Sequence, residues 1–246
     1  MIGSAGALGG LALGSGFAGS TAAQSDDEEE DGEEGEGEEA EPVDNEFEDD
    51  VDILNFALTL EYLEARFYAE GLENIDEEDL CSCRAFGGED DPLRERAYEE
   101  LETIQAHEEA HVEALQDAIE ELDGEPVEEP EFDFGMAVEY PMAFLGTAAQ
   151  LEDVGVSAYA GAAPYIENEE ILVPALGIHS VEARHASFLR TLNGETGFPD
   201  VVDAPRSRSE IEELVAPYVV DMEQEGDEEQ EDDEEQEDDE EQEDDE

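Results

Sequence analysis

The chain has 246 residues, with 78 Asp and Glu against 8 Lys and Arg, and its formal net charge is −70. All eight of the latter are arginine. So large a negative charge excludes binding to nucleic acids or to anionic membranes through charge. At molar salt the Debye length falls to about 3 Å, so the self-repulsion of the chain is screened there and not in dilute buffer. This composition is typical of a halophile.

The acids are concentrated in two segments, which set the domain boundaries. Residues 25–50 and 223–246 are dominated by Asp and Glu, and the second segment repeats DEEQED. Such segments bury too little apolar surface to fold, so we expect a disordered linker and a disordered tail. Residues 51–222 hold nearly all the aromatic and branched apolar residues. We expect one folded domain there, with its own core.

Residues 1–24 contain no charged residue and end in small residues before the acidic segment. They resemble a truncated export signal of the twin-arginine type, although the arginine pair is missing. A low-complexity tail and a true start further upstream are the alternatives. No other run approaches about 20 apolar residues, so we expect no membrane span in the mature chain. We expect the protein to be exported, outside the cell or on its surface.

The folded segment is expected to be all-α, because apolar residues recur at helical spacing and no stretch alternates like a half-buried strand. The expected helices cover residues 51–71, 91–122, 141–164 and 168–194, with a shorter one over 209–222. Gly71 is interpreted as a helix end and Asp91 as an N-cap, while Pro174 moves the regular part of the fourth helix to about Val173. The connection after the second helix is long enough to return along the bundle. We therefore predict a four-helix bundle of two antiparallel pairs joined by a long crossover.

Two of the expected helices carry the pattern Glu-x-x-His. Glu108 is followed by His111, and Glu182 is followed by His185. Three residues advance about 300° around a helix and about 4.5 Å along it, so both side chains lie at adjoining positions of one face. They can therefore bind the same metal or neighbouring metals, and two copies indicate two metals.

The other two helices carry a second pattern, a glutamate followed seven residues later by a tyrosine. It joins Glu61 to Tyr68 and Glu152 to Tyr159. Seven residues are nearly two turns, so each tyrosine lies on the face of its own glutamate. One Glu from each of two helices, with Glu-x-x-His from each of two others, is typical of di-iron or di-manganese bundles. The predicted ligands of two iron ions, or alternatively of two manganese ions, are Glu61, Glu108, His111, Glu152, Glu182 and His185.

These segments resemble the ferritin-like superfamily, and within it the branch of exported ferritin-like and desiccation-related proteins. The source expected from the acidic composition is a halophilic archaeon. The resemblance rests on LEYLEARFY, HEEAH, LEDVGVSAYAGAAP and VEARHASFLRTLNG, and it covers most of residues 51–220. It implies that the six predicted residues bind the metals and that Glu108 and Glu182 bridge them. It also places Tyr68 and Tyr159 near the metals as candidate catalytic residues. The sequence has no rubredoxin-type Cys-x-x-Cys module, which argues against a complete rubrerythrin-like electron chain.

Several polar neighbours of these motifs leave alternatives open. Glu64 competes with Glu61 as the ligand from the first helix, and Glu61 is favoured because it shares the tyrosine spacing. His107 is a candidate for a supporting residue or an accessory ligand, and His179 is a weaker candidate, but solvated or hydrogen-bonded histidines are the simpler interpretation of both. Two further residues are expected to orient ligands or to form interhelical pairs: Asp153 and Arg184.

The two cysteines, Cys81 and Cys83, lie between the first and second expected helices. A disulfide within Cys-x-Cys closes a strained small ring, and two cysteines are too few for a zinc site. A redox-active disulfide, a link between subunits and reduced thiols all stay open.

The expected function is oxidation of Fe(II) by O₂ or H₂O₂ at the dinuclear site, with a role in oxidative or desiccation stress by analogy with the family. The nearest alternative is disproportionation of peroxide in the manner of a manganese catalase. The other is a structural or protective bundle without catalysis. The expected partners are the metal ions with O₂ or H₂O₂ and no nucleic acid, and assembly into a homo-oligomer stays open.

Overall fold

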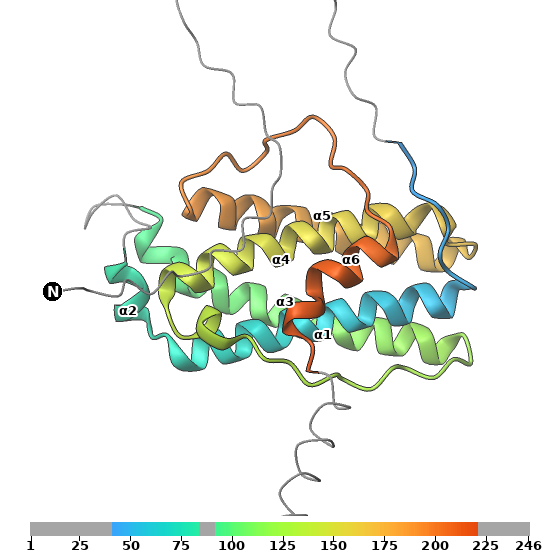
Figure 1. Ribbon diagram of the computed structural model, residues 1–246, viewed down its shortest axis with the longest axis horizontal. Helices are drawn as coiled ribbons and strands as arrows, with labels where there is room; N and C mark the ends of the chain where they lie inside the picture. The colour runs from blue at the N-terminus through green and yellow to red at the C-terminus, as the bar shows by residue number, and fades with distance from the viewer. Residues whose placement is uncertain (1–40, 84–91, 221–246) are drawn as a thin grey trace, which may run out of the picture. The chain divides into compact units, whose positions relative to one another are not determined.

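The all-α prediction is confirmed. The computed structural model describes residues 41–83 and 92–220, and over these residues it consists of helices with one isolated bridge, between Phe132 and Val219. Among the described residues, the long helices that form the bundle (Figure 1) are α1 (Asp50–Asn74), α3 (Arg94–Glu121), α4 (Pro141–Ala162) and α5 (Glu169–Leu192). Shorter elements flank them: α2 (Glu77–Ser82), α6 (Arg208–Val215) and 3-10 turns at Gly135–Val138, Ala163–Tyr165 and Ala216–Tyr218.

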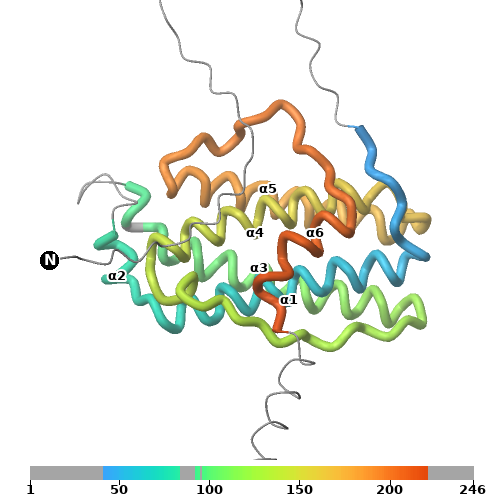
Figure 2. The backbone as a smooth tube through the Cα atoms, viewed as in Figure 1, coloured from blue at the N-terminus to red at the C-terminus, as the bar shows by residue number. Residues whose placement is uncertain are grey.

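The bundle is made of two antiparallel helix pairs, as predicted. α1 packs along α3 and α4 packs along α5, while α1 and α4 also touch each other. Residues 122–140 return along the bundle and join the two pairs (Figure 2). Backbone hydrogen bonds hold this crossover against the end of the domain: the Asp133 N–H donates to the Tyr218 carbonyl and the Val220 N–H donates to the Glu131 carbonyl, both at 2.9 Å.

Gly71 does not end the first helix, so that prediction was wrong. α1 continues to Asn74, and the Ile75 N–H bonds to the Gly71 carbonyl at 2.9 Å. The glycine is required by packing instead, because a methyl group at this position would collide with the ring of Phe144 on α4. The absence of a side chain lets that ring lie against the backbone of α1.

Pro174 does not delay the start of α5, so the expected start near Val173 was also wrong. The helix begins at Glu169, after Asn168, whose side chain accepts a 3.0 Å hydrogen bond from the Glu170 N–H. Proline has no N–H, so the Glu170 carbonyl lacks its helical partner. Both residues are exposed, and water can therefore bond to that carbonyl.

α6 is shorter than the helix predicted over 209–222, of which residues 221 and 222 lie outside the described residues. It begins with a capping box, in which the Glu210 N–H donates to the Ser207 hydroxyl (3.3 Å) and the Ser207 N–H donates to the Glu210 carboxylate (2.9 Å). It ends at Val215 because Pro217 cannot continue the α-helical hydrogen bonds. Its buried residues, Ile211 and Val215, hold it on the bundle.

Some predicted features lie wholly or partly outside the described residues. The export signal predicted over 1–24, the tail predicted over 223–246 and the N-cap Asp91 lie wholly outside them. The linker predicted over 25–50 lies outside them up to residue 40. Just before α1, the Glu46 carboxylate accepts hydrogen bonds from the N–H and the hydroxyl of Ser209, at 2.7 and 2.9 Å. Within the described ranges, none of the helices combines the length and the apolar character needed to cross a membrane.

Two apolar clusters fill the bundle, and buried polar residues lie between them. Along α3, Ile104 belongs to the first cluster and Leu115 to the second. Between these two positions α3 buries Glu108. Along α5, Ile178 belongs to the second cluster and Leu189 to the first, so both helices carry the polar level between apolar packing.

Candidate metal centre

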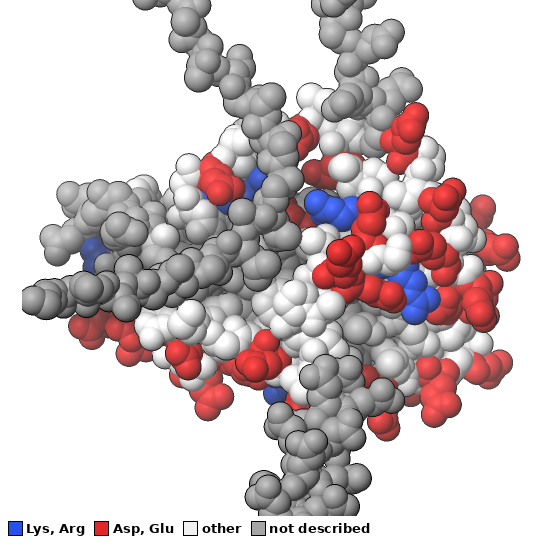
Figure 3. All heavy atoms as spheres, in the orientation of Figure 1, with Lys and Arg blue, Asp and Glu red and all other residues white. Residues whose placement is uncertain are grey.

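Four glutamates differ from the acids that cover the surface. Figure 3 shows Asp and Glu side chains spread over much of the visible face, with few Arg among them. By contrast, four glutamates inside the bundle have 0% exposure and come one from each long helix: Glu61, Glu108, Glu152 and Glu182. Burial of an unpaired carboxylate is costly, so this cluster requires positive partners.

The first such partner is His111 on α3. Its Nδ1 lies 3.2 Å from Oε2 of Glu61, 3.1 Å from Oε2 of Glu108 and 3.0 Å from Oε1 of Glu182. The His111 side chain is 12% exposed. Carboxylates from three helices therefore converge on a single imidazole nitrogen.

The second partner is His185 on α5, in a matching arrangement. Its Nδ1 lies 2.9 Å from Oε1 of Glu108, 3.3 Å from Oε2 of Glu152 and 3.8 Å from Oε2 of Glu182. Its side chain is 6% exposed. The two Glu-x-x-His motifs thus face each other across the bundle.

Glu108 and Glu182 take part in both arrangements. Each directs one carboxylate oxygen toward His111 and the other toward His185. Among the described residues, the ligand atoms of each group lie within 4.8 Å of one another; the groups are Glu61, Glu108, His111 and Glu182, and Glu108, Glu152, Glu182 and His185. All six predicted ligands are therefore brought together, and the two expected to bridge are the two that are shared.

The tyrosines of the repeated pattern bond across the bundle. The Tyr68 hydroxyl donates to Oε1 of Glu152 at 2.6 Å, and the Tyr159 hydroxyl donates to Oε1 of Glu61 at 2.6 Å. Each tyrosine thus bonds the glutamate of the other helix pair rather than the one seven residues before it. Both hydroxyls therefore bond carboxylates of the cluster.

In the metal-free protein the two histidines carry the positive charge of the cluster. Burial disfavours the charged form, but the adjoining carboxylates raise the pKa of His111 and of His185 to about 12. Burial and the charge of Glu182 raise the pKa of Glu61 and of Glu152 well above the ordinary value. Although burial opposes it, contact with both histidines lowers the pKa of Glu182 to about 2. In the protein without metal, these shifts favour protonated histidines beside an ionised Glu182.

The cluster also contains buried polar atoms without hydrogen bonds. Within the described residues these include Oε1 of Glu108, Oε2 of Glu152, both carboxylate oxygens of Glu182 and Nδ1 of His185. The close approaches between them are therefore not aligned as hydrogen bonds. Oxygen and imidazole donors that converge in this way suit iron and manganese. The buried Glu and His groups can bind metal ions.

His107 contacts the cluster from the surface side. Its Nδ1 lies 3.0 Å from Nε2 of His185, the ring nitrogen that faces away from the carboxylates, and the two rings stack with centroids 5.3 Å apart. His107 itself is exposed. This contact favours a supporting role for His107, because a bond to Nε2 of His185 fixes the direction in which Nδ1 of the same ring points.

Three other polar residues near the motifs lie outside the two groups. His179 belongs to neither group, and within the described residues its Nε2 has no hydrogen-bond partner. Asp153 forms the expected interhelical pair, 2.6 Å from Arg190 on α5. Arg184 instead donates a 2.6 Å hydrogen bond to the Ser180 carbonyl, one turn earlier on its own helix.

Glu64 is buried beside the cluster, at 3% exposure, although it belongs to neither group. The position that converges with His111 is held by Glu61, as favoured from the tyrosine spacing. The sequence interpretation treated Glu64 as an alternative to Glu61, whereas both side chains are buried here. The sequence interpretation did not identify Gly155, which lies against Glu64. The sequence does contain a sign of this pairing, because Glu64 follows Glu61 by three residues and Gly155 follows Glu152 by three residues.

Cys81 and Cys83, both among the described residues, lie at the end of α2 and are not joined in a disulfide. The Cys81 Sγ lies 3.3 Å from the Arg94 carbonyl oxygen. Neither cysteine belongs to the two carboxylate–histidine groups.

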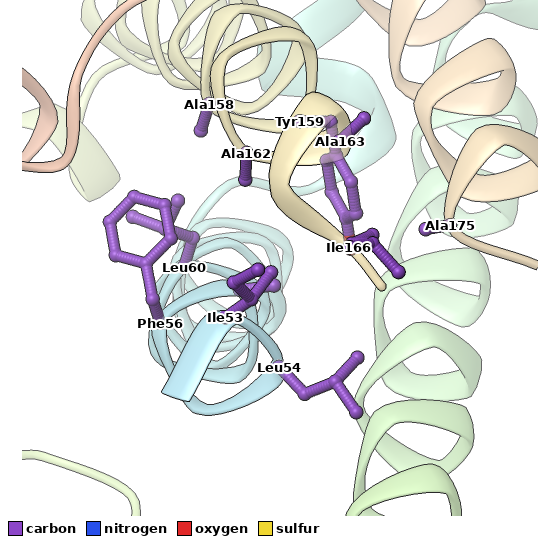
Figure 4. Close-up of a pocket in the computed structure, with 11 residues that line it drawn as sticks. Ile53, Leu54, Phe56, Leu60, Ala158, Tyr159, Ala162, Ala163, Ile166 and Ala175 are labelled. Carbon is purple, nitrogen blue, oxygen red and sulfur yellow. The ribbon is translucent and has the colours of Figure 1, made fainter. Parts of the chain in front are cut away.

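A small apolar cavity lies beside Tyr159, between α1, α4 and α5 (Figure 4). Its volume is about 20 Å³, which is room for one water-sized molecule. Its walls include Leu54, Leu60, Ala162 and Ala175 together with the tyrosine, and they present apolar surface. Because water needs polar partners, the cavity suits a small apolar molecule better.

Comparison with known proteins agrees with this geometry. No curated protein matches the chain. The family model described as the ferritin-like domain matches residues 49–195, which is more than half of the chain and includes all six converging residues. The chain therefore belongs to the ferritin-like domain family.

Proposed function

We propose that this protein binds two iron ions and oxidises Fe(II) with O₂ or H₂O₂. The observation that carries the proposal is the sharing of Glu108 and Glu182 between two groups, each with its own histidine. Shared carboxylates hold two metal ions close together, and this ligand set is typical of di-iron bundles. Membership of the ferritin-like family supports the choice of metal.

The protein side chains prepare the centre for a charged pair of ions. The four fully buried glutamates, once ionised, balance the charge of two divalent ions, and each histidine offers a neutral nitrogen after it loses its proton. When bound, the iron pair supplies the electrons that reduce O₂ or peroxide. Tyr68 and Tyr159 hold the carboxylates of Glu152 and Glu61 in place, and they are the candidates to deliver a proton or an electron.

The apolar cavity supports O₂ as one oxidant. O₂ is small and apolar, and the cavity has room for a molecule of that size. The ring of Tyr159 forms part of its wall, while the hydroxyl of the same residue bonds Glu61 of the cluster. The cavity thus stores O₂ one side chain away from the metal ligands.

Metal analysis and oxidation kinetics test the proposal together. The wild-type protein should bind two iron ions per chain and oxidise Fe(II) under O₂ or H₂O₂ in molar salt. The variants Glu108→Ala and His185→Ala should lose both properties, because each removes a donor of the cluster. Glu113→Ala is the matched control, since Glu113 is exposed on the same helix as Glu108. Unchanged oxidation in both cluster variants would overturn the catalytic proposal.

Two further outcomes have their own readouts. The same oxygen and nitrogen donors suit manganese, in which case manganese-loaded protein would release O₂ from H₂O₂. A structural bundle would contain little metal, or would hold it without turnover. The proposed setting is outside the cell, where removal of peroxide and free Fe(II) would limit oxidative or desiccation damage, by analogy with related proteins.

A further inference from the structure

The repeat that relates α1 to α4 is broken at one position next to the cluster. The two helices share a glutamate and a tyrosine seven residues apart, Glu61 with Tyr68 and Glu152 with Tyr159. Three residues after its glutamate, however, α1 has a glutamate and α4 has a glycine. The pair that breaks the repeat is Glu64 and Gly155.

These two residues face each other in the bundle. A methyl group placed on Gly155 would lie 3.1 Å from Oε1 of Glu64 and 3.6 Å from Oε2 of the shared carboxylate Glu182. The Glu64 carboxylate therefore occupies space that the glycine leaves free, beside a residue common to both groups. A side chain on α4 at this point would compete for that space.

Among the described residues, no histidine or arginine forms an ion pair with Glu64. It is 3% exposed, and its carboxylate takes part in none of the ion pairs that His111 and His185 make. Burial, followed by the charges of Glu182 and Glu152, raises its pKa well above the ordinary value. A carboxylate in such a place is costly unless a cation joins it. The cluster beside it is the place where cations would bind.

We propose that Glu64 is a seventh ligand of the metal centre, held in the space left by Gly155, and that it makes the two metal positions unequal. The inference rests on the proposed di-metal centre. Four carboxylates already balance two divalent ions, so a fifth gives the centre surplus negative charge and favours ions of higher charge. Because the other half of the repeat has glycine, the extra donor is present on one side of the pair.

Titration with Co²⁺ tests this without any turnover. The wild-type chain should bind two Co²⁺, and Glu64→Gln, which keeps the shape and removes the charge, should still bind two. One of the two steps should weaken by about 10-fold or more in Glu64→Gln. The visible absorption of bound Co²⁺ should also change, because an uncharged amide replaces a carboxylate at the metal. Gly155→Ala, which keeps Glu64 but crowds it, should weaken the same step by a smaller factor.

Thermal unfolding separates a ligand from a packing residue. With chelator present, Glu64→Gln should melt at the wild-type temperature or above it, because it removes a poorly balanced acid. With saturating Co²⁺, the same variant should melt below wild type. Glu70→Gln is the matched control, since it removes one charge from α1 away from the cluster. It should give the same small shift in both conditions.

The failures can be told apart. If wild type binds two Co²⁺ and Glu64→Gln matches it in affinity, spectrum and melting, the seventh-ligand inference is overturned while the di-metal centre stands. Lower melting of Glu64→Gln with and without Co²⁺ would also overturn it, because that result marks a purely structural residue. If wild type binds no Co²⁺, both proposals fall.

Discussion

Tyr68 on α1 donates a 2.6 Å hydrogen bond to Glu152 on α4, the glutamate of the opposite helix pair. Tyr159 and Glu61 make the reciprocal bond at the same distance. The two halves of the repeat are therefore linked at the level of the carboxylate–histidine cluster and not only through their apolar packing. Each half supplies the hydroxyl that positions a carboxylate of the other half. A substitution of Tyr68 should therefore disturb Glu152, and a substitution of Tyr159 should disturb Glu61.

Tyr68→Phe and Tyr159→Phe should each destabilise the protein and slow its oxidation of Fe(II). Each removes a buried hydroxyl that bonds a buried carboxylate, which should cost about 1–3 kcal/mol of unfolding free energy. Metal stoichiometry should stay at two. Urea unfolding in molar salt and rapid-mixing kinetics measure the two effects. Tyr62→Phe is the control, because Tyr62 on α1 bonds Gln116 and not the cluster. Equal effects in Tyr62→Phe and Tyr68→Phe would contradict the prediction.

The metal-free protein should lose stability as the pH rises above about 6.5. His111 and His185 have a pKa of about 12 when folded, against an ordinary value of 6.5, so the folded chain holds more protons between these values. Their contribution is complete below 6.5 and is lost as pH rises toward about 12. The raised pKa values of Glu61 and Glu152 act in the same direction. Glu182, with a pKa of about 2, contributes stability that is lost only as the pH falls toward that value.

Bound metal should reverse this trend. The metal needs the histidines neutral and the carboxylates ionised, so its binding releases protons and its affinity rises with pH. Urea midpoints of chelator-treated and Co²⁺-loaded protein, compared across neutral to alkaline pH, should move in opposite directions. Proton release on Co²⁺ addition can be read with an indicator dye. Parallel pH profiles for the two forms, or binding without proton release, would show that protonated histidines do not hold the empty cluster.

Removal of salt should unfold the protein. With a net charge of −70, the chain repels itself, and this repulsion is screened only when the Debye length is short. Circular dichroism should report loss of helix as molar salt is dialysed away and recovery when salt is returned. Sucrose at equal osmotic strength should not restore the signal, because it does not screen charge. A stable helical signal at millimolar salt would count against adaptation to high salt.

The periodic features of this molecule could be predicted from its sequence, while contacts between helices could not. The Glu-x-x-His spacing determines which side chains share a face, and the two-fold repeat predicts that four such faces meet. A spacing of seven residues says nothing about which neighbouring helix a tyrosine reaches, and so the bond from Tyr68 to Glu152 was not foreseen. The role of Gly71 depends in the same way on Phe144, which lies far along the chain on α4.

Filling the cavity beside Tyr159 should slow oxidation by O₂ more than oxidation by H₂O₂. Ala162 is buried in the cavity wall, so Ala162→Leu places extra carbon atoms in a space of about 20 Å³. O₂ is apolar and would lose this apolar holding site, whereas polar H₂O₂ gains little from it. Ala114→Leu, an exposed change on α3, is the control for the substitution itself. Overpacking should lower stability by about 1–3 kcal/mol, so rates are compared with each variant fully folded in molar salt. Equal slowing with both oxidants would mean that the variant disturbs the metal ligands through Tyr159, and that the cavity is not a store of O₂.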